Sequence, residues 1–207
     1  LANLATGIGR PDYAIAIAKR AAQRGTELPE LNWPTPAYGH ADNPPIEQPL
    51  IYAITRQESA FAADAVSHVG ARGLMQLMPG TAKVVSRRLN VNYEKRLLTD
   101  DPGYNTLLGS SYLAGLISDF DGSYVLAIAA YNAGPANVRR WIKDWGDPRT
   151  SEIDMVDWIE LIPYSETRNY VQRVLENLQV YRERLKGRQA GLLQIGSATR
   201  GIVPLAD

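Results

Sequence analysis

The amino-acid sequence predicts an all-α fold. Apolar residues recur at helical spacing in several segments between Tyr13 and Leu185, and Pro, Gly and Asp residues separate those segments. No segment shows the convincing alternation of apolar and polar residues that a half-buried strand requires. With 207 residues, of which 45% are hydrophobic and 21% charged, the chain is long enough to bury a core without disulfide bonds.

The expected helices, in chain order, cover residues 13–24, 50–59, 82–89, 103–120, 124–133, 135–145 and 165–185. Thr81 and Ser165 are suitable N-caps, whereas Gly25 and Gly146 are suitable C-terminal stops. Segment 124–133 is almost wholly apolar and too short to cross a bilayer. We therefore expect it to be the central helix of the core.

A proline-rich segment separates the first expected helix from the others. Six prolines fall between residues 29 and 49. Proline lacks an amide donor and restricts the preceding residue, so this segment is expected to be an extended linker or a wrapping arm. We predict three parts: a helix with the proline-rich arm at 1–45, the main helical domain at 46–187, and a weakly patterned tail at 188–207.

Composition excludes several classes of function. The 22 basic and 22 acidic residues balance, so no electrostatic footprint for nucleic acid is present. The absence of Cys excludes disulfides and thiolate metal sites, and two isolated histidines, His40 and His68, argue against a histidine metal site. No apolar run is long enough for a membrane span, and no signal peptide is visible. Because the chain begins at Leu1, we expect a processed product whose targeting information is missing.

One carboxyl group stands out at the end of the expected helix 50–59. Glu58 follows an apolar stripe and precedes Ser59, Ala60 and Phe61. The helix macrodipole and apolar neighbours both favour the protonated form of a carboxyl group at such a place, which suits a general acid. The pattern alone leaves a second interpretation open, namely a solvated glutamate paired with Arg56 or another cation.

Three further segments carry polar groups that could serve a binding site. Gln76 lies in a glycine-punctuated segment, and its amide can bind sugar hydroxyls. Tyr131 and Asn132 end the apolar helix, where they either line a polar cleft or simply satisfy the helix terminus. Glu166 opens the last helix, a place that the helix dipole alone explains.

Three tryptophans in the second half of the chain allow two interpretations. They are Trp141, Trp145 and Trp158, and they are either platforms on which sugar rings stack or, as we favour, core residues.

Four stretches, taken together, indicate one protein family far more specifically than any single stretch does. They are 56–61 (RQESAF), 73–82 (GLMQLMPGTA), 129–135 (AAYNAGP) and 162–171 (IPYSETRNYV). In order and spacing they resemble the catalytic domain of the soluble lytic murein transglycosylases, and the resemblance runs from about residue 46 to 185. It implies a goose-lysozyme-like helical domain with a substrate groove. It also implies that the first 45 residues are the end of a preceding helical region.

The resemblance further implies the site and its chemistry. Glu58 matches the single catalytic acid and base of the family. The residues that match its substrate-binding positions are Ser67, Gln76, Met78, Tyr131, Asn132, Glu166 and Tyr170. The implied reaction cleaves the β-1,4 bond between N-acetylmuramic acid and N-acetylglucosamine in peptidoglycan and leaves a 1,6-anhydromuramic end. Neither a metal nor an organic cofactor takes part.

The implied partners are peptidoglycan glycan strands, together with a missing N-terminal helical domain or other cell-wall machinery, and the implied location is the periplasm. Two alternatives stay open at this point. A muramidase on the same fold would admit water and release a reducing end. A non-catalytic glycan-binding domain would need no Glu58, and the presence of Glu58 among intact motifs argues against it.

Overall fold

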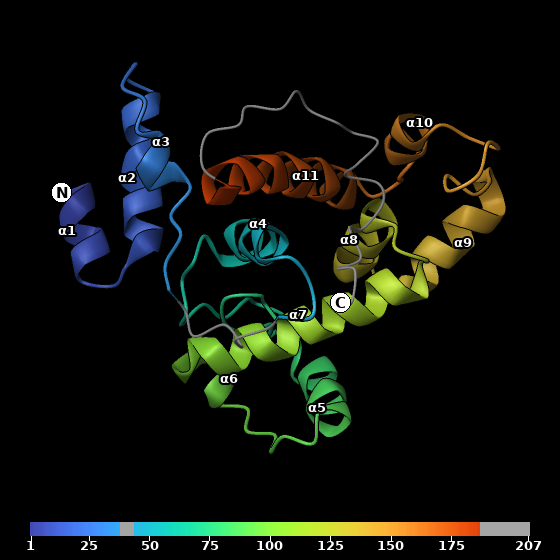
Figure 1. Ribbon diagram of the computed structural model, residues 1–207, viewed down its shortest axis with the longest axis horizontal. Helices are drawn as coiled ribbons and strands as arrows, with labels where there is room; N and C mark the ends of the chain where they lie inside the picture. The colour runs from blue at the N-terminus through green and yellow to red at the C-terminus, as the bar shows by residue number, and fades with distance from the viewer. Residues whose placement is uncertain (38–43, 187–207) are drawn as a thin grey trace. The chain divides into compact units, whose positions relative to one another are not determined.

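The computed structural model describes residues 1–37 and 44–186 (Figure 1). Throughout these residues the regular elements are α-helices, supplemented by two isolated β-bridges. The all-α prediction is therefore confirmed. The predicted tail at 188–207 lies outside the described residues. Two compact units are distinguished, Leu1–Tyr112 and Leu113–Asp207, and they are described one at a time below.

The first unit holds the earlier helices of the chain. They are α1 (Ala2–Gly7), α2 (Pro11–Ala22), α3 (Pro29–Asn32), α4 (Gln48–Ser59), α5 (Pro79–Arg88), α6 (Leu97–Asp100) and the first part of α7 (Pro102–Asp119). Helix α1 packs against α2, and α2 packs against α3. Helix α5 begins at Pro79 rather than after Thr81, because proline fits the first helical position, where no amide hydrogen is needed.

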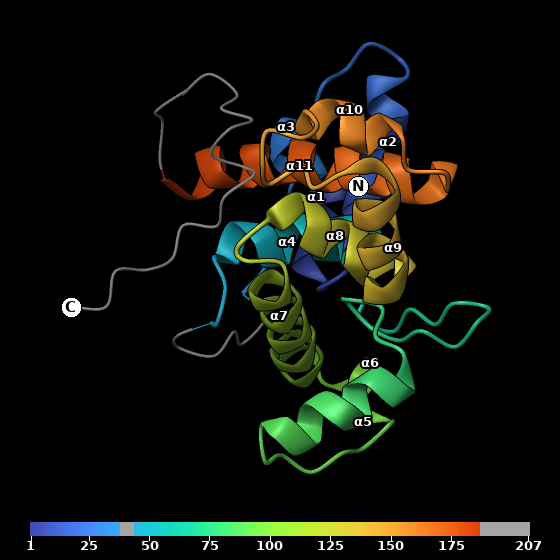
Figure 2. The ribbon, with the colours of Figure 1, turned by 90° about the vertical axis from the view of Figure 1, so that its right-hand side faces the viewer.

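Helix α4 supplies much of the first unit's core. Residues 50–55 are all buried, and Leu50, Ala53 and Ile54 have no exposed surface. The loop between α4 and α5 doubles back on itself (Figure 2), with antiparallel bridges from Arg72 to Val66 and to Leu77. This loop directly follows the end of the helix on which Glu58 lies.

The second unit is built around α8. It holds the rest of α7, α8 (Tyr124–Ala133), α9 (Pro135–Trp145), α10 (Met155–Glu160) and α11 (Ser165–Lys186). Helix α8 is buried from Tyr124 to Ala130 and packs against both α9 and α11. Its N-terminus is capped by Ser123, whose hydroxyl accepts a hydrogen bond from the Leu126 amide at 3.4 Å. The prediction that 124–133 is a central core helix is confirmed.

Aromatic side chains form a cluster within the second unit. Trp141 and Trp158 are almost fully buried, with ring centroids 6.3 Å apart in an edge-on arrangement. Trp145 is half-buried and stacks on Trp141 at 5.8 Å. Trp141 and Trp158 are therefore core residues, as the sequence favoured. Among the helices of the described segments, none is long and apolar enough to cross a membrane.

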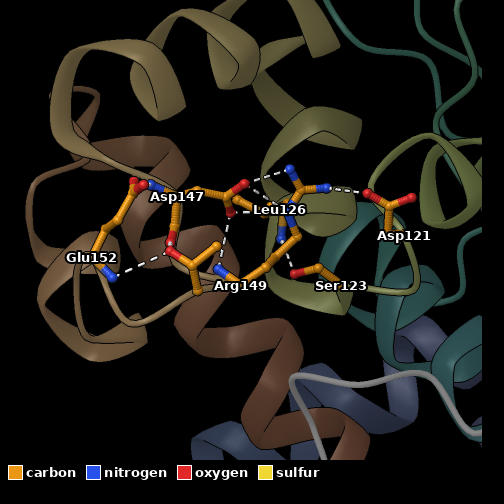
Figure 3. Close-up of polar contacts among 7 residues, drawn as sticks. Asp121, Ser123, Leu126, Asp147, Arg149 and Glu152 are labelled. Carbon is orange, nitrogen blue, oxygen red and sulfur yellow. Dashed lines mark hydrogen bonds and ion pairs between the residues drawn. The ribbon is translucent and has the colours of Figure 1, made fainter.

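An arginine joins two loops of the second unit (Figure 3). Arg149 donates to both carboxylate oxygens of Asp147, at 2.8 and 2.6 Å, and to Asp121 at 2.6 Å. The Asp147 amide in turn donates to the Glu152 carboxylate at 2.9 Å. The loop after α9 is thereby connected to the turn between α7 and α8. The hydrogen bonds from Arg149 lower the pKa of Asp147 below its ordinary value, although burial opposes them.

We expect Asp147→Asn to lower the free energy of unfolding at pH 7 by about 0.5–1 kcal/mol, since solvent screens a partly exposed ion pair. A carboxyl group whose pKa is lowered by folding stabilises the protein above the unfolded-state pKa. That contribution is lost as the pH falls through the folded-state value. Urea unfolding at pH 7 and at about pH 3 should therefore show the difference from wild type shrinking at the lower pH. Asp144→Asn, at an exposed position of α9, is the control, and a pH-independent difference for Asp147→Asn would contradict the expectation.

Candidate active site

Glu58 lies one residue before the end of α4 and is half-buried. The helix stops abruptly after it, because Ala60 (φ 50°) and Phe61 (φ 68°) both adopt left-handed backbone conformations. Such conformations are disfavoured for residues with a side chain and persist only where the surroundings enforce them. The position of Glu58 is thus set by a constrained reversal of the chain.

Ser59 fixes this reversal. Its hydroxyl donates to the Leu74 carbonyl oxygen at 2.8 Å and accepts from the Phe61 amide at 3.1 Å. Phe61 is 1% exposed and packs against Tyr52, with ring centroids 6.0 Å apart. The C-terminus of α4 is therefore attached both to the following loop and to its own earlier turn.

Within the loop between α4 and α5, Ser67 and Gln76 make bonds to the backbone. The Ser67 hydroxyl accepts from the Ala71 amide at 3.0 Å and so closes a tight turn. The Gln76 side-chain amide donates to the carbonyl oxygens of Gly73 at 2.9 Å and Ala65 at 3.2 Å. Since both of its hydrogens have partners in the loop, the carbonyl oxygen Oε1 is the part of Gln76 best suited to contact a ligand.

The two methionines of this segment differ in environment. Met75 is fully buried, whereas Met78 is 44% exposed directly before α5. Of the predicted site residues, Glu58, Ser67, Gln76 and Met78 belong to the first unit. Ser67 and Gln76 share one loop, and Ser59 connects that loop to the helix of Glu58.

A buried asparagine on α7, which the sequence analysis did not single out, organises the same loop. Asn105 has no exposed surface and accepts from the Met75 amide at 2.8 Å. Its own amide donates to the carbonyl oxygens of Arg72 and Leu98, each at 2.9 Å. In the sequence, Asn105 is notable only as a lone amide side chain within the apolar pattern of residues 103–120. Nothing in the sequence identifies its hydrogen-bond partners.

The remaining predicted residues belong to the second unit. Tyr131 and Asn132 are half-buried in the last turn of α8, while Glu166 is exposed in the first turn of α11. The Thr167 hydroxyl donates to Asn132 Oδ1 at 2.7 Å, which ties the end of α8 to the start of α11. Tyr170, one turn further along α11, is 5% exposed. Asn132 thus bonds to the side chain of the residue that directly follows Glu166.

Gly73 lies very close to Leu98 and Asn105. A substitution of Gly73 therefore tests whether these contacts constrain the loop. Gly73 has φ +73°, and an added Cβ would lie 1.9 Å from the Leu98 carbonyl oxygen and 2.3 Å from Asn105 Nδ2. We expect Gly73→Ala to lower the free energy of unfolding by at least ~3 kcal/mol, because the clash with fixed backbone adds to the strain of a positive φ.

Gly70→Ala is the matched control for this experiment. Gly70 has φ +90° but no atom within 4 Å of an added Cβ, so only the backbone strain applies. We expect a loss of about 1–2 kcal/mol. Urea titrations with unchanged m-values would make the comparison. Equal losses for the two variants would show that the contacts to Asn105 and Leu98 do not constrain the loop.

Comparison with known proteins identifies the family. The profile of the family described as "Transglycosylase SLT domain" matches residues 37–153, which is more than half of the chain. The chain belongs to this family. A second profile, "Soluble lytic transglycosylase helical domain", matches residues 161–190.

Several curated relatives of this SLT-family chain are described as soluble lytic murein transglycosylases. The soluble lytic murein transglycosylase of Escherichia coli K12 is 41% identical over 138 residues, covering 66% of this chain and 21% of the relative. That of Salmonella typhimurium is 40% identical over 146 residues, covering 70% and 22%. The chain therefore spans about a fifth of the length of these relatives.

Two solved structures of other proteins have folds similar to that of this chain. The lytic transglycosylase Slt of Pseudomonas aeruginosa, an inactive glutamate-to-glutamine mutant, is 42% identical with a TM-score of 0.77, covering 91% of this chain and 30% of that one. The 70-kDa soluble lytic transglycosylase of E. coli is 32% identical with a TM-score of 0.81, covering 97% and 32%. The predicted family and the lysozyme-like helical fold class are confirmed.

Proposed function

We propose that this SLT-family chain carries the catalytic part of a peptidoglycan lytic transglycosylase. It would cleave the β-1,4 bond between N-acetylmuramic acid and N-acetylglucosamine and leave a 1,6-anhydromuramic end. The observation that carries the proposal is the 41% identity over 138 residues to a soluble lytic murein transglycosylase. This similarity extends well beyond the proposed catalytic residue, Glu58. The periplasm is the compartment where such a substrate is found.

Glu58 is the proposed catalytic acid and base. It is half-buried, and the chain reversal that follows it constrains the backbone from which its side chain extends. General acid catalysis requires a position within hydrogen-bonding distance of the leaving oxygen. The glutamate-to-glutamine change that accompanies inactivity in the Pseudomonas relative supports the choice of a glutamate.

The proposed reaction needs only one carboxyl group. Glu58 donates its proton to the glycosidic oxygen, and the C–O bond to the muramic anomeric carbon breaks while the substrate's 2-acetamido oxygen stabilises the cationic carbon. The ionised Glu58 then removes the proton of the muramic C6 hydroxyl, whose oxygen bonds to the anomeric carbon. The proton taken from the C6 hydroxyl leaves Glu58 protonated again, as it was before the reaction. An internal hydroxyl is favoured over water because its effective concentration is high.

The other predicted residues are proposed to bind the glycan. Ser67, Gln76 and Met78 would contribute from the loop after Glu58, of which Met78 presents the most exposed side chain. Tyr131, Asn132, Glu166 and Tyr170 would contribute from the ends of α8 and α11, which the bond between Thr167 and Asn132 holds together. A 70-kDa soluble lytic transglycosylase, 33% identical to this chain, has been solved in complex with bulgecin A, and we propose that this chain binds the same compound.

Replacement of Glu58 by Gln should abolish release of soluble fragments from purified sacculi while the fold is retained. The substitution preserves shape but removes the transferable proton. General acid–base catalysis contributes ~10²–10⁴-fold, and one residue here serves both transfers, so we expect a loss at the upper end. Glu94→Gln makes the same chemical change at an exposed residue of the first unit and should leave the rate unchanged. Near-normal turnover by folded Glu58→Gln protein would refute the mechanism.

Replacement of Glu166 by Gln should reduce the initial rate by less than Glu58→Gln and leave the product unchanged. Glu166 is exposed in the first turn of α11, where the helix dipole favours a negative charge. There it can orient the sugar or stabilise positive charge without transferring the proton. Rates and product masses for both variants on one batch of sacculi would make the comparison. A loss as deep as that of Glu58→Gln would indicate a pair of catalytic carboxylates instead.

A further inference from the structure

The last residue of α3 and the segment that follows it lie directly against the helix that carries Glu58. Within the first unit, the Tyr52 hydroxyl donates to the Pro36 carbonyl oxygen at 2.9 Å. One helical turn later, Arg56 Nε donates to the Asn32 carbonyl oxygen at 2.8 Å, and its guanidinium lies 4.8 Å from the centre of the Trp33 ring. We call residues 32–36 the brace.

The chemistry of the brace explains why it can act as a rigid support. Pro34 and Pro36 restrict the backbone to extended conformations, and the carbonyl oxygens of Asn32 and Pro36 accept hydrogen bonds from α4. Asn32 and Pro34 are buried, so the brace is part of the packed first unit. Tyr52 is 3% exposed, so its hydroxyl is shielded from water where it donates to the Pro36 carbonyl oxygen.

The contacts fall on one face of α4. Tyr52 and Arg56 are four residues apart and therefore share a face, whereas Glu58 is two residues beyond Arg56 and so about 200° further round the helix. The brace thus contacts the side of α4 roughly opposite Glu58. Ser59 fixes the end of the helix, and the brace fixes the two turns before it.

We propose that the brace is a positioning element for Glu58, acting through Tyr52 and Arg56. This inference rests on the proposed function, because it assigns the brace to the acid and base of that reaction. Asn32 to Pro36 precede the stretch that matches the SLT profile, which begins at residue 37. The functional catalytic unit would therefore begin earlier than the family match. A displacement of the acid by about 1 Å can cost up to ~100-fold in rate without weakening substrate binding.

The test measures kcat and KM of the full 207-residue chain on a soluble glycan of alternating N-acetylglucosamine and N-acetylmuramic acid. For Tyr52→Phe, which removes only the hydroxyl, we expect kcat to fall about tenfold with KM within about twofold of wild type. Tyr104→Phe is the matched control. It removes a hydroxyl that also donates to a backbone carbonyl oxygen, that of Asn92 at 2.8 Å, in the same unit.

Trp33→Leu changes the brace itself and should also lower kcat rather than raise KM. Combined with Arg56→Lys, its effect should be less than the product of the two single losses, since both changes disrupt one contact. A normal kcat for Tyr52→Phe and Trp33→Leu, or a loss of kcat for Tyr104→Phe equal to that for Tyr52→Phe, would overturn the inference. A wild-type chain without turnover would instead contradict the proposed function on which the inference rests.

Discussion

The hydrogen bond from the Ser59 hydroxyl to the Leu74 carbonyl oxygen joins the helix of Glu58 to the loop that follows it. On the far side of that loop, Asn105 bonds to the neighbouring Met75 amide and to the Arg72 carbonyl oxygen. The loop is thus fixed from α4 and from α7 at adjacent residues. If the Ser59 bond were lost, the chain reversal after Glu58 would be detached from this loop.

That strain is concentrated where the proposed chemistry takes place. Ala60, Phe61 and Gln76 all have positive φ values although none is glycine. Each such conformation costs of order 1–3 kcal/mol, which the surrounding packing must offset. Phe61 does so by burying its ring against Tyr52, and Gln76 does so by bonding to two carbonyl oxygens of its own loop. These contacts hold the backbone of the reversal that follows Glu58.

Much of the helical architecture was predictable from the sequence. Residues 124–133 and 135–145 form helices with the predicted bounds, because apolar composition and the flanking Gly and Pro residues determine both ends. The short helices α1, α3, α6 and α10 were missed, since two turns or fewer give no measurable periodicity. The bonds from Asn132 to Thr167 and from Asn105 to Met75 and Arg72 could not be predicted, because these partners lie 30 to 35 residues away along the chain. The sequence predicted an extended linker or a wrapping arm where the brace lies, and its contacts with Tyr52 and Arg56 required the structure. The division of the chain at residues 45 and 187 and the roles assigned to the site residues stay predictions.

The central claim is that Glu58 directs the substrate's own C6 hydroxyl, and not water, to the anomeric carbon. Digestion of purified sacculi in water enriched in oxygen-18, followed by mass spectrometry of the released sugars, tests this claim most directly. The account predicts products that end in 1,6-anhydromuramic acid, lack the mass of one water and carry no oxygen-18. Products with reducing ends that contain oxygen-18 would contradict it and would indicate a muramidase on the same fold.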